Sequence, residues 1–331
     1  MSETSEQATL QASEVGAEVR ELARGLQNEL EQLIQGQGEV IQQLLISLVA
    51  GGHILLEGVP GVAKTLLVRS LAASLRCQFS RIQFTPDLMP SDVTGVNVFD
   101  ARASRFEFRP GPLFGELVLA DEINRAPAKT QAALLEAMQE RQVSIDGVTH
   151  TLPPVFTVIA TQNPVEYEGT YPLPEAQLDR FLMKVLVGYP SESAERLMLQ
   201  TMHRLGEKAT QPTQVLRALA DPAVILRARA YALNLHIDEP VLEYILKLVR
   251  QSRSHRQLSL GCSPRAAVML MSAAKALAVL RGRTFVTPDE VQSVFLPTLR
   301  HRVQLTPEAE IEGLSADAVL KSLLTQVAIP R

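Results

Sequence analysis

Eight residues in the first fifth of the chain have the types and spacing of a phosphate-binding loop. Their sequence is Gly58-Val59-Pro60-Gly61-Val62-Ala63-Lys64-Thr65. An apolar run precedes them, and a segment with leucines at helical spacing follows. A strand, a glycine-bearing loop and a helix that begins with Lys-Thr direct backbone N–H groups toward an anion. Lys64 would reach the β- and γ-phosphates, and the Thr65 hydroxyl would hold Mg²⁺. The alternative is an ordinary Gly-Pro turn before a helix with a solvated lysine.

One position departs from the usual pattern of such a loop. Ala63 stands where glycine is common before the lysine. If the backbone is left-handed there, an alanine costs roughly 1 kcal/mol or more.

A pair of acids follows a second apolar run, Leu117–Ala120. Ligands of parallel sheets bind at the carboxyl ends of the strands, which is where Asp121 and Glu122 would lie. Asp121 would hold the Mg²⁺ shell, and Glu122 would orient or deprotonate the attacking water. Asn163, after another apolar run, could hold the same water or the γ-phosphate. Its alternative is a turn before Pro164.

Three long motifs together resemble the MoxR family of AAA+ ATPases over roughly residues 20–330. They are Gly-x-Pro-Gly-x-Ala-Lys-Thr at 58–65, Asp-Glu-Ile-Asn-Arg-Ala-Pro at 121–127 and Leu-Pro-Glu-Ala-Gln-Leu-Asp-Arg-Phe at 173–181. The resemblance implies that alanine before the lysine is normal. It also implies extra hairpins after the second strand and before the fourth.

The same resemblance implies further site residues. Asn163 corresponds to sensor 1, and Arg180 to an arginine finger that reaches a neighbouring subunit's γ-phosphate. The alternative for Arg180 is a salt bridge with Asp179 or Glu175. Arg265 corresponds to sensor 2, with a solvated arginine as its alternative, and Gln37 to the segment against adenine. Leu66 would complete the nucleotide-binding loop, and Gln83 would tune Glu122.

The apolar pattern predicts an α/β fold with a parallel sheet flanked by helices. The predicted strands are His53–Leu56, Phe79–Phe84, Leu117–Ala120, Val155–Ala160 and Met183–Val187. Hairpins are predicted at 96–108 and 142–151, the second around Asp146-Gly147. We expect a polar, disordered tail at 1–18, an AAA+ nucleotide-binding core at 19–190 and a smaller, all-helical lid at 191–331. Helix starts are marked by Ser263-Pro264 and by Thr287-Pro288-Asp289-Glu290.

Composition restricts the function classes. The net charge is −4 over 331 residues, and residues 191–331 carry 18 Lys and Arg against 13 Asp and Glu. An acidic protein is a poor sequence-independent DNA binder, so a nucleic-acid partner is not expected. Two cysteines, no basic-then-apolar leader and no long apolar segment favour a cytoplasmic protein without a membrane span. The scattered histidines predict no zinc site.

These observations predict an ATP- and Mg²⁺-dependent ATPase. The resemblance implies a homo-oligomeric ring, a hexamer, that remodels or activates protein clients, often with a partner bearing a von Willebrand factor A domain. Two alternatives stay open: a helicase-like DNA motor and a nucleotide-gated scaffold with little turnover. A GTPase is disfavoured, because no Asn-Lys-x-Asp motif occurs.

Overall fold

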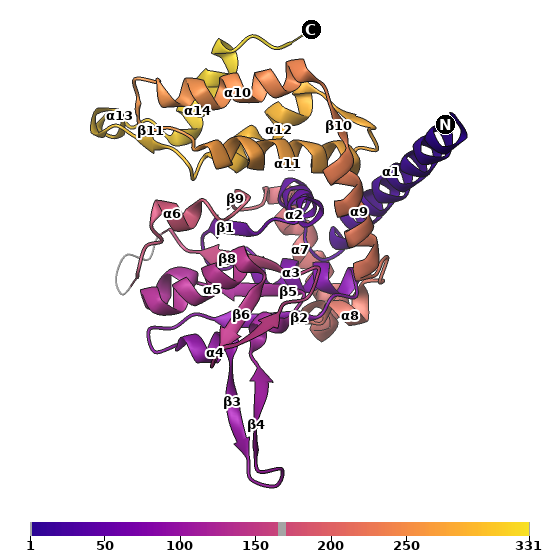
Figure 1. Cartoon of the computed structure of the whole chain (residues 1–331), viewed down its shortest axis with the longest axis vertical. Coiled ribbons are helices and arrows are strands. Elements are labelled where there is room, and N and C mark those ends of the chain that lie inside the picture. The colour runs from indigo at the N-terminus through magenta and orange to yellow at the C-terminus, as the bar shows by residue number, and fades with distance from the viewer. Residues whose placement is uncertain (1, 165–169, 331) are drawn as a thin grey trace.

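A five-stranded parallel sheet forms the centre of the molecule. The computed structural model describes residues 2–164 and 170–330. The strand order is β2-β5-β8-β1-β9, with every neighbouring pair parallel (Figure 1). The bounds are β1 Ile54–Gly58, β2 Phe79–Gln83, β5 Leu117–Asp121, β8 Thr157–Gln162 and β9 Met183–Val187.

All five predicted strands exist, but most of their ends differ from the prediction: β1 ends at Gly58 rather than at Leu56, and β2 ends at Gln83 rather than at Phe84. β5 includes Asp121, and β8 runs from Thr157 to Gln162 rather than from Val155 to Ala160. Asp121 pairs in register with Gln83, and Gln162 pairs with Glu57. The ladder bonds join backbone groups, so pairing continues where the side chains change from apolar to polar.

The sheet separates two apolar cores. Ile54 and Leu56 face one core with helices α2 (Gly38–Ala50) and α3 (Lys64–Ser74). Leu55 faces the other core with α5 (Ala128–Glu140). Successive strand side chains point to opposite faces, so a continuous apolar run packs against helices on both sides.

Two hairpins and several short elements complete the core. β3 (Gly95–Asp100) pairs with β4 (Arg105–Pro110), and β6 (Gln142–Ile145) pairs with β7 (Val148–Thr151), as predicted. The β3–β4 hairpin projects far from the sheet (Figure 1). The short helices are α4 Pro90–Thr94, α6 Glu175–Leu178 and the 3-10 turns η1 Pro112–Phe114 and η2 Ile123–Arg125.

The N-terminal prediction was wrong. Helix α1 spans Ser2–Leu30, although we expected disorder up to residue 18. Val19, Leu26 and Leu30 are buried in the core and fix the helix. The preceding segment, residues 2–18, contains four Glu, three Ala and two Gln, which continue an established helix at little cost.

The C-terminal part is mainly helical. Its elements are α7 Glu192–Leu205, η3 Gly206–Thr210, α8 Pro212–Val215, α9 Pro222–Asn234, α10 Glu239–Arg253, α11 Pro264–Leu280, α12 Pro288–Leu299, α13 Pro307–Ile311 and α14 Ala316–Gln326. α8 ends at Val215, and Leu216 after it is extended. The predicted caps are present: Ser263 accepts from the Ala266 amide, and Thr287 forms a capping box with Glu290.

We expected an all-helical lid, but the lid also contains two pairs of short strands. β10 (His236–Ile237) pairs with β12 (Phe285–Val286), and β11 (Leu258–Leu260) with β13 (Gln304–Leu305). These short pairs form where interhelical loops lie side by side, which sequence periodicity does not reveal. The domain boundary after residue 190 stays a prediction. The Leu219 amide donates to Ser74 O of α3 at 2.8 Å, so the chain around Leu219 packs on the core.

A buried arginine fastens the lid to the sheet. Arg302 Nε donates to Asp179 Oδ1 at 2.7 Å, and its side chain is 1% exposed. Arg302 also donates to the backbone carbonyls of Phe181 and Leu182, directly before β9. Among the helices within the described ranges, none has the length and apolarity to cross a membrane.

Candidate nucleotide site

The phosphate-binding loop connects the carboxyl end of β1 to α3. Lys64 Nζ donates to Gly58 O at 2.6 Å across the base of the loop. Gly61 has φ +85°, and a Cβ there would meet no atom within 4 Å, so this glycine is needed for its backbone conformation rather than for space. Ala63 adopts φ 59° and ψ 24°. The alanine therefore carries the left-handed strain, on the order of 1–2 kcal/mol.

Gln37 connects this loop to helix α2. It precedes α2, and its Nε2 donates to Val62 O at 3.1 Å. Its Oε1 is buried and accepts no hydrogen bond from the residues that the structure describes. A buried amide oxygen without a donor is costly, so a ligand N–H placed beside it would gain a bond.

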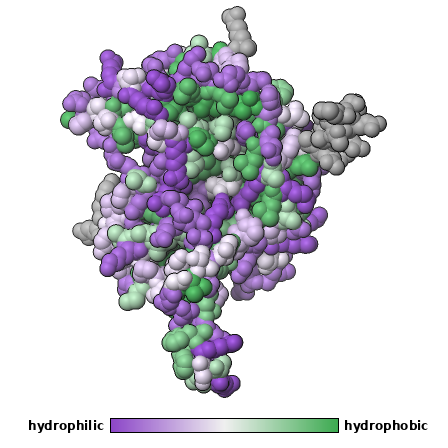
Figure 2. Space-filling model, viewed as in Figure 1, coloured by the Kyte–Doolittle hydropathy of each residue, from purple (hydrophilic) through white to green (hydrophobic). Residues whose placement is uncertain are grey.

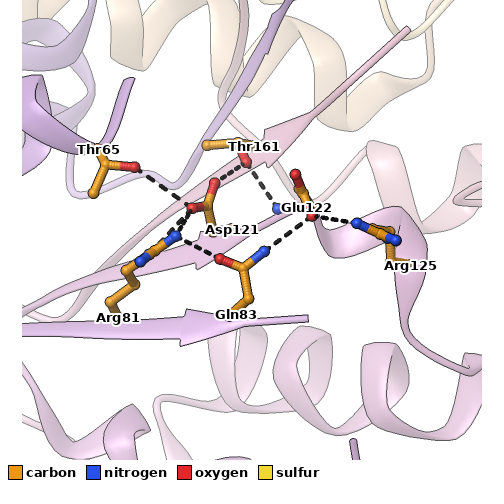
Figure 3. A network of polar contacts seen from close by, with 7 residues as sticks. All are labelled: Thr65, Arg81, Gln83, Asp121, Glu122, Arg125 and Thr161. Atoms are coloured by element: carbon orange, nitrogen blue, oxygen red, sulfur yellow. Dashed lines mark hydrogen bonds and ion pairs between the residues drawn. The ribbon is translucent and has the colours of Figure 1, made fainter. Parts of the chain in front are cut away.

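Asp121, the last residue of β5, lies opposite Thr65 in the first turn of α3 (Figure 3). Thr65 Oγ1 is 3.5 Å from Asp121 Oδ2, and Thr161 Oγ1 donates to Asp121 Oδ1 at 2.6 Å. Arg81 of β2 donates to Oδ2 through Nη2 at 2.7 Å. Each contact comes from a different strand or helix, so the parallel sheet assembles this carboxylate's surroundings.

Glu122 has a strained backbone. Its φ is 57° and its ψ is 50°, and its amide donates to Thr161 Oγ1 at 2.8 Å. Glu122 Oε2 accepts from Gln83 Nε2 at 2.9 Å and from Arg125 Nη1 at 3.1 Å (Figure 3). A left-handed glutamate costs on the order of 1–3 kcal/mol and persists when surrounding contacts fix it. Gln83 therefore contacts the residue that it was predicted to tune, and the tuning itself stays a prediction.

Two residues of this network were missed by the sequence analysis. Arg81 links Asp121 to Gln83 Oε1, and Thr161 links Asp121 to the Glu122 amide. Alternation along a strand gave a usable signal: Arg81 and Gln83 are two apart and so share one face of β2. Thr161 belongs to β8, whereas the predicted strand ended at Ala160.

The donor atoms around Asp121 suit Mg²⁺. Hydroxyl and carboxylate oxygens are its preferred ligands, and one or two carboxylates with substrate phosphates commonly suffice. No cluster of three or more His, Cys, Asp or Glu able to hold a metal occurs in the described ranges 2–164 and 170–330. Asn163 directly follows β8 and is 6% exposed, at the same edge of the sheet. Its role as sensor 1 stays a prediction.

Arg180 lies toward the opposite edge of the sheet. The Leu182 amide donates to His53 O at 2.7 Å, directly before β9 and β1 begin, whereas Gly58 pairs with Val187. About 3.3 Å per residue puts roughly 13 Å between the ends of β9. Arg180 Nη1 donates to Leu135 O of α5 at 2.6 Å. Neither suggested salt bridge forms: Asp179 bonds Arg302, and Glu175 bonds Gln304.

Arg265 lies near Asp179 and not in the phosphate-binding loop. It is exposed in the first turn of α11, whose cap residue Ser263 has its Oγ 3.5 Å from Asp179 Oδ2. The structure therefore brings together Gln37, Lys64, Thr65, Asp121 and Glu122, while Arg180 and Arg265 lie near Asp179.

Two family models match this chain. Residues 53–183 match the model of the ATPase family associated with various cellular activities (AAA), and residues 250–323 match the AAA lid domain. The chain is 43% identical to Chaperone MoxR1 of Mycobacterium tuberculosis over 329 residues, covering 97% of this chain and 85% of that protein. The chain belongs to the MoxR family of AAA+ ATPases.

Other relatives of this MoxR-family chain cover nearly its full length. YeaC of Bacillus subtilis is 48% identical over 301 residues, covering 91% of this chain and 92% of that protein. A solved structure from Cytophaga hutchinsonii is 40% identical, with a TM-score of 0.89, and covers 98% of this chain and 99% of that one. The predicted fold, an AAA+ core with a lid, is therefore confirmed.

The Gln83–Glu122 bond gives a first prediction for this MoxR-family ATPase. Gln83→Ala removes the donor to Glu122 Oε2 and leaves Arg125 as its partner. We expect kcat for ATP hydrolysis to fall about tenfold. Without this hydrogen bond the carboxylate is held less firmly, and the activation free energy rises by about 1.4 kcal/mol. Steady-state phosphate release measures this change. Gln139→Ala, on the last turns of α5, is the matched control. An unchanged kcat in Gln83→Ala would contradict the positioning role.

Proposed function

We propose that this protein is a ring-forming ATPase that hydrolyses ATP at subunit interfaces and uses the energy to remodel protein targets. The position of Arg180 carries this proposal. The phosphate-binding loop and the acids lie at one edge of the sheet, and Arg180 lies toward the other. A guanidinium in that position cannot complete its own subunit's site, but it suits the site of an adjacent copy.

Each residue of the loop edge has a role in this reaction. The loop amides and Lys64 would bind the phosphates, and Gln37 Oε1 would accept a hydrogen bond from the adenine amino group. Thr65 and Asp121 would hold Mg²⁺, which supplies charge neutralisation on the phosphate oxygens. Glu122 would orient the attacking water and take its proton, and Asn163 would fix the same water.

Arg265 would act together with Arg180. The α11 cap lies against Asp179, the residue before Arg180. Both cations therefore belong to one surface, and we infer that both reach the nucleotide of the neighbouring subunit. Positive charge delivered there stabilises the transition state of phosphoryl transfer. Helix α11 belongs to the lid, so hydrolysis would move lid and core relative to each other.

The β3–β4 hairpin is the surface best suited to contact a protein target. Phe99 and Phe106 are 54% and 70% exposed and pack edge to face at 5.3 Å. Figure 2 shows apolar and polar side chains mixed at its far end. Exposed aromatic side chains on a projecting element are typical of protein-binding sites.

Mixing two inactive variants tests the shared site. Arg180→Ala keeps Glu122, and Glu122→Gln keeps Arg180, so a site is complete only where the two variants meet in the right order. A 1:1 mixture should recover about a quarter of wild-type turnover, since random assembly in a closed ring completes that share of sites. Phosphate release by the parents and the mixture measures this recovery.

The control for this mixture is a chain that carries both substitutions. It cannot complete a site in any arrangement and should stay inactive. Arg180→Ala should also bind ATP with wild-type affinity. A mixture no more active than its parents, or full activity of Arg180→Ala alone, would disprove the shared site.

A further inference from the structure

A cavity lies at the edge of the sheet opposite the phosphate-binding loop. Its volume is about 390 Å³, and it is lined by the end of α2, by α9, by the lid helix α11 and by residues next to β1 and β8. Figure 1 shows α2, α9 and α11 as neighbours, and they contact one another. Core and lid thus each form part of its wall.

Three cations line this cavity, and their hydrogen bonds go to neutral groups. Arg141 donates to Gly51 O at 2.6 Å and to Phe156 O at 3.4 Å. Arg229 donates to Leu48 O at 2.8 Å and to Pro154 O at 2.9 Å. Lys275 Nζ donates to Leu233 O at 3.0 Å. These bonds anchor the side chains but leave their charges uncancelled.

Among the residues that the structure describes, the lining contains no acid to balance these charges. Its described titratable members are Arg141, Arg229 and Lys275. Burial, together with the neighbouring Arg141 charge, lowers the pKa of Arg229 to about 10. Arg141 also keeps unused donors: a guanidinium has five N–H groups, and its two bonds employ two of them. A ligand with negative charge would relieve this repulsion and find donors ready.

The remaining wall is apolar. Leu226, Leu233 and Met271 line it, and Leu226 and Leu233 are 37% and 75% exposed. In Figure 2 apolar side chains gather along α9 and over the lid helices. A concave site with apolar walls and a few convergent polar groups is typical of a small-molecule site.

We propose that this cavity binds a small organic oxyanion, a carboxylate or phosphate joined to an apolar body. The charged group would lie against Arg141, Arg229 and Lys275, and the body against the leucines of α9. Because Lys275 belongs to the lid and Arg141 to the core, the bound anion would join the two.

The site is placed to influence nucleotide binding, an extension that rests on the proposed function. Helix α2 has Gln37 at one end and lines the cavity with Val49 and Ala50 at the other. Helix α11 carries Arg265 in its first turn and Lys275 about three turns later. A ligand that fixes lid to core would change nucleotide affinity, and the nucleotide would change the ligand's affinity by the same factor.

Binding of 1-anilinonaphthalene-8-sulfonate to the full chain tests the site. This dye is an organic oxyanion with an apolar body, and the protein contains no tryptophan to interfere with its fluorescence. We expect one dye per chain. N-phenyl-1-naphthylamine, which has the same rings without the charge, should bind at least tenfold more weakly. Equal binding of the two dyes would overturn the proposal, because the charge would then be irrelevant.

Two variants locate the dye. Lys275→Gln removes a charge and Ser272→Leu reduces the cavity with the charges intact, and each should weaken binding about tenfold. Lys247→Gln, on the exposed face of α10, is the matched control and should bind like the wild type. Far-UV circular dichroism verifies folding. Wild-type affinity in both cavity variants would overturn the proposal.

Competition against the dye distinguishes a carboxylate ligand from a phosphate ligand. Octanoate and hexyl phosphate should displace the dye with different affinities, and the stronger competitor identifies the preferred group. Displacement by neither would overturn the proposal. Saturating competitor should also shift ATP affinity in the wild type more than in Lys275→Gln. If ATP binds normally without competitor and shows no shift with it, only the coupling fails and the proposed function stands.

Discussion

The Glu122→Gln variant will bind ATP with wild-type affinity and hydrolyse it roughly 10²- to 10⁴-fold more slowly, the usual contribution of a general base. Glutamine can orient water but cannot take its proton. Glu122 is held on both sides: Thr161 fixes its amide, and Gln83 and Arg125 hold its carboxylate. The strained φ of 57° indicates that the surrounding fold maintains this position. Single-turnover hydrolysis and titration with a fluorescent ATP analogue measure the two quantities.

Glu136→Gln is the matched control for this prediction. Glu136 is exposed on α5, so the same chemical change there should leave turnover within about twofold of the wild type. Hydrolysis by Glu122→Gln within threefold of the wild type would refute its role as base. Loss of ATP binding in Glu122→Gln would assign it to binding instead.

The free energy of unfolding will fall as the pH drops below about 6.5, because two buried histidines are neutral in the folded protein. His53 donates from Nε2 to Met138 O at 3.0 Å and accepts the Val158 amide on Nδ1 at 2.9 Å. Burial lowers the pKa of His53 to about 3. Burial and then the Arg302 charge lower the pKa of His301 well below its usual value.

The sign follows from proton uptake. Below about pH 6.5 the unfolded chain binds protons on both histidines and the folded chain does not, so protons favour unfolding. Above that pH the stability is fully present. A histidine that stays neutral costs about 1.4 kcal/mol per pH unit, so His53, with its pKa of about 3, accounts for about 2 kcal/mol between pH 6.5 and 5, and His301 adds to the loss in the same direction. Urea denaturation at several pH values measures this slope.

The His53→Gln variant separates the contribution of the histidines to the pH dependence of stability from the contribution of the carboxylates. Glutamine can still donate and accept but does not titrate, so the slope between pH 5 and 6.5 should fall by about half. His301→Gln should give a similar reduction. His203→Gln, at an exposed position of α7, should leave the slope unchanged. Equal slopes in all four proteins would show that these histidines do not govern the acid sensitivity.

Much of the nucleotide site could be predicted from local sequence. A strand, a loop and a helix are consecutive in the chain, so residues 58–65 specify the phosphate-binding geometry without distant contacts, including the left-handed Ala63. Asp121 and Glu122 follow from the same logic, because the ends of parallel strands meet at one edge of the sheet.

The sequence by itself determined the five central strands, the two hairpins and the loop at residues 58–65, since backbone conformation and apolar periodicity are local properties. Tertiary structure alone decided the long-range contacts. Strand order brings Arg81 of β2 to Asp121 of β5, 40 residues away. The Arg302–Asp179 pair spans 123 residues and brings the α11 end that carries Arg265 beside Arg180. Lid docking also encloses three cations from separate elements in one cavity. Contacts this distant depend on how helices pack on the sheet, and no local pattern encodes that packing.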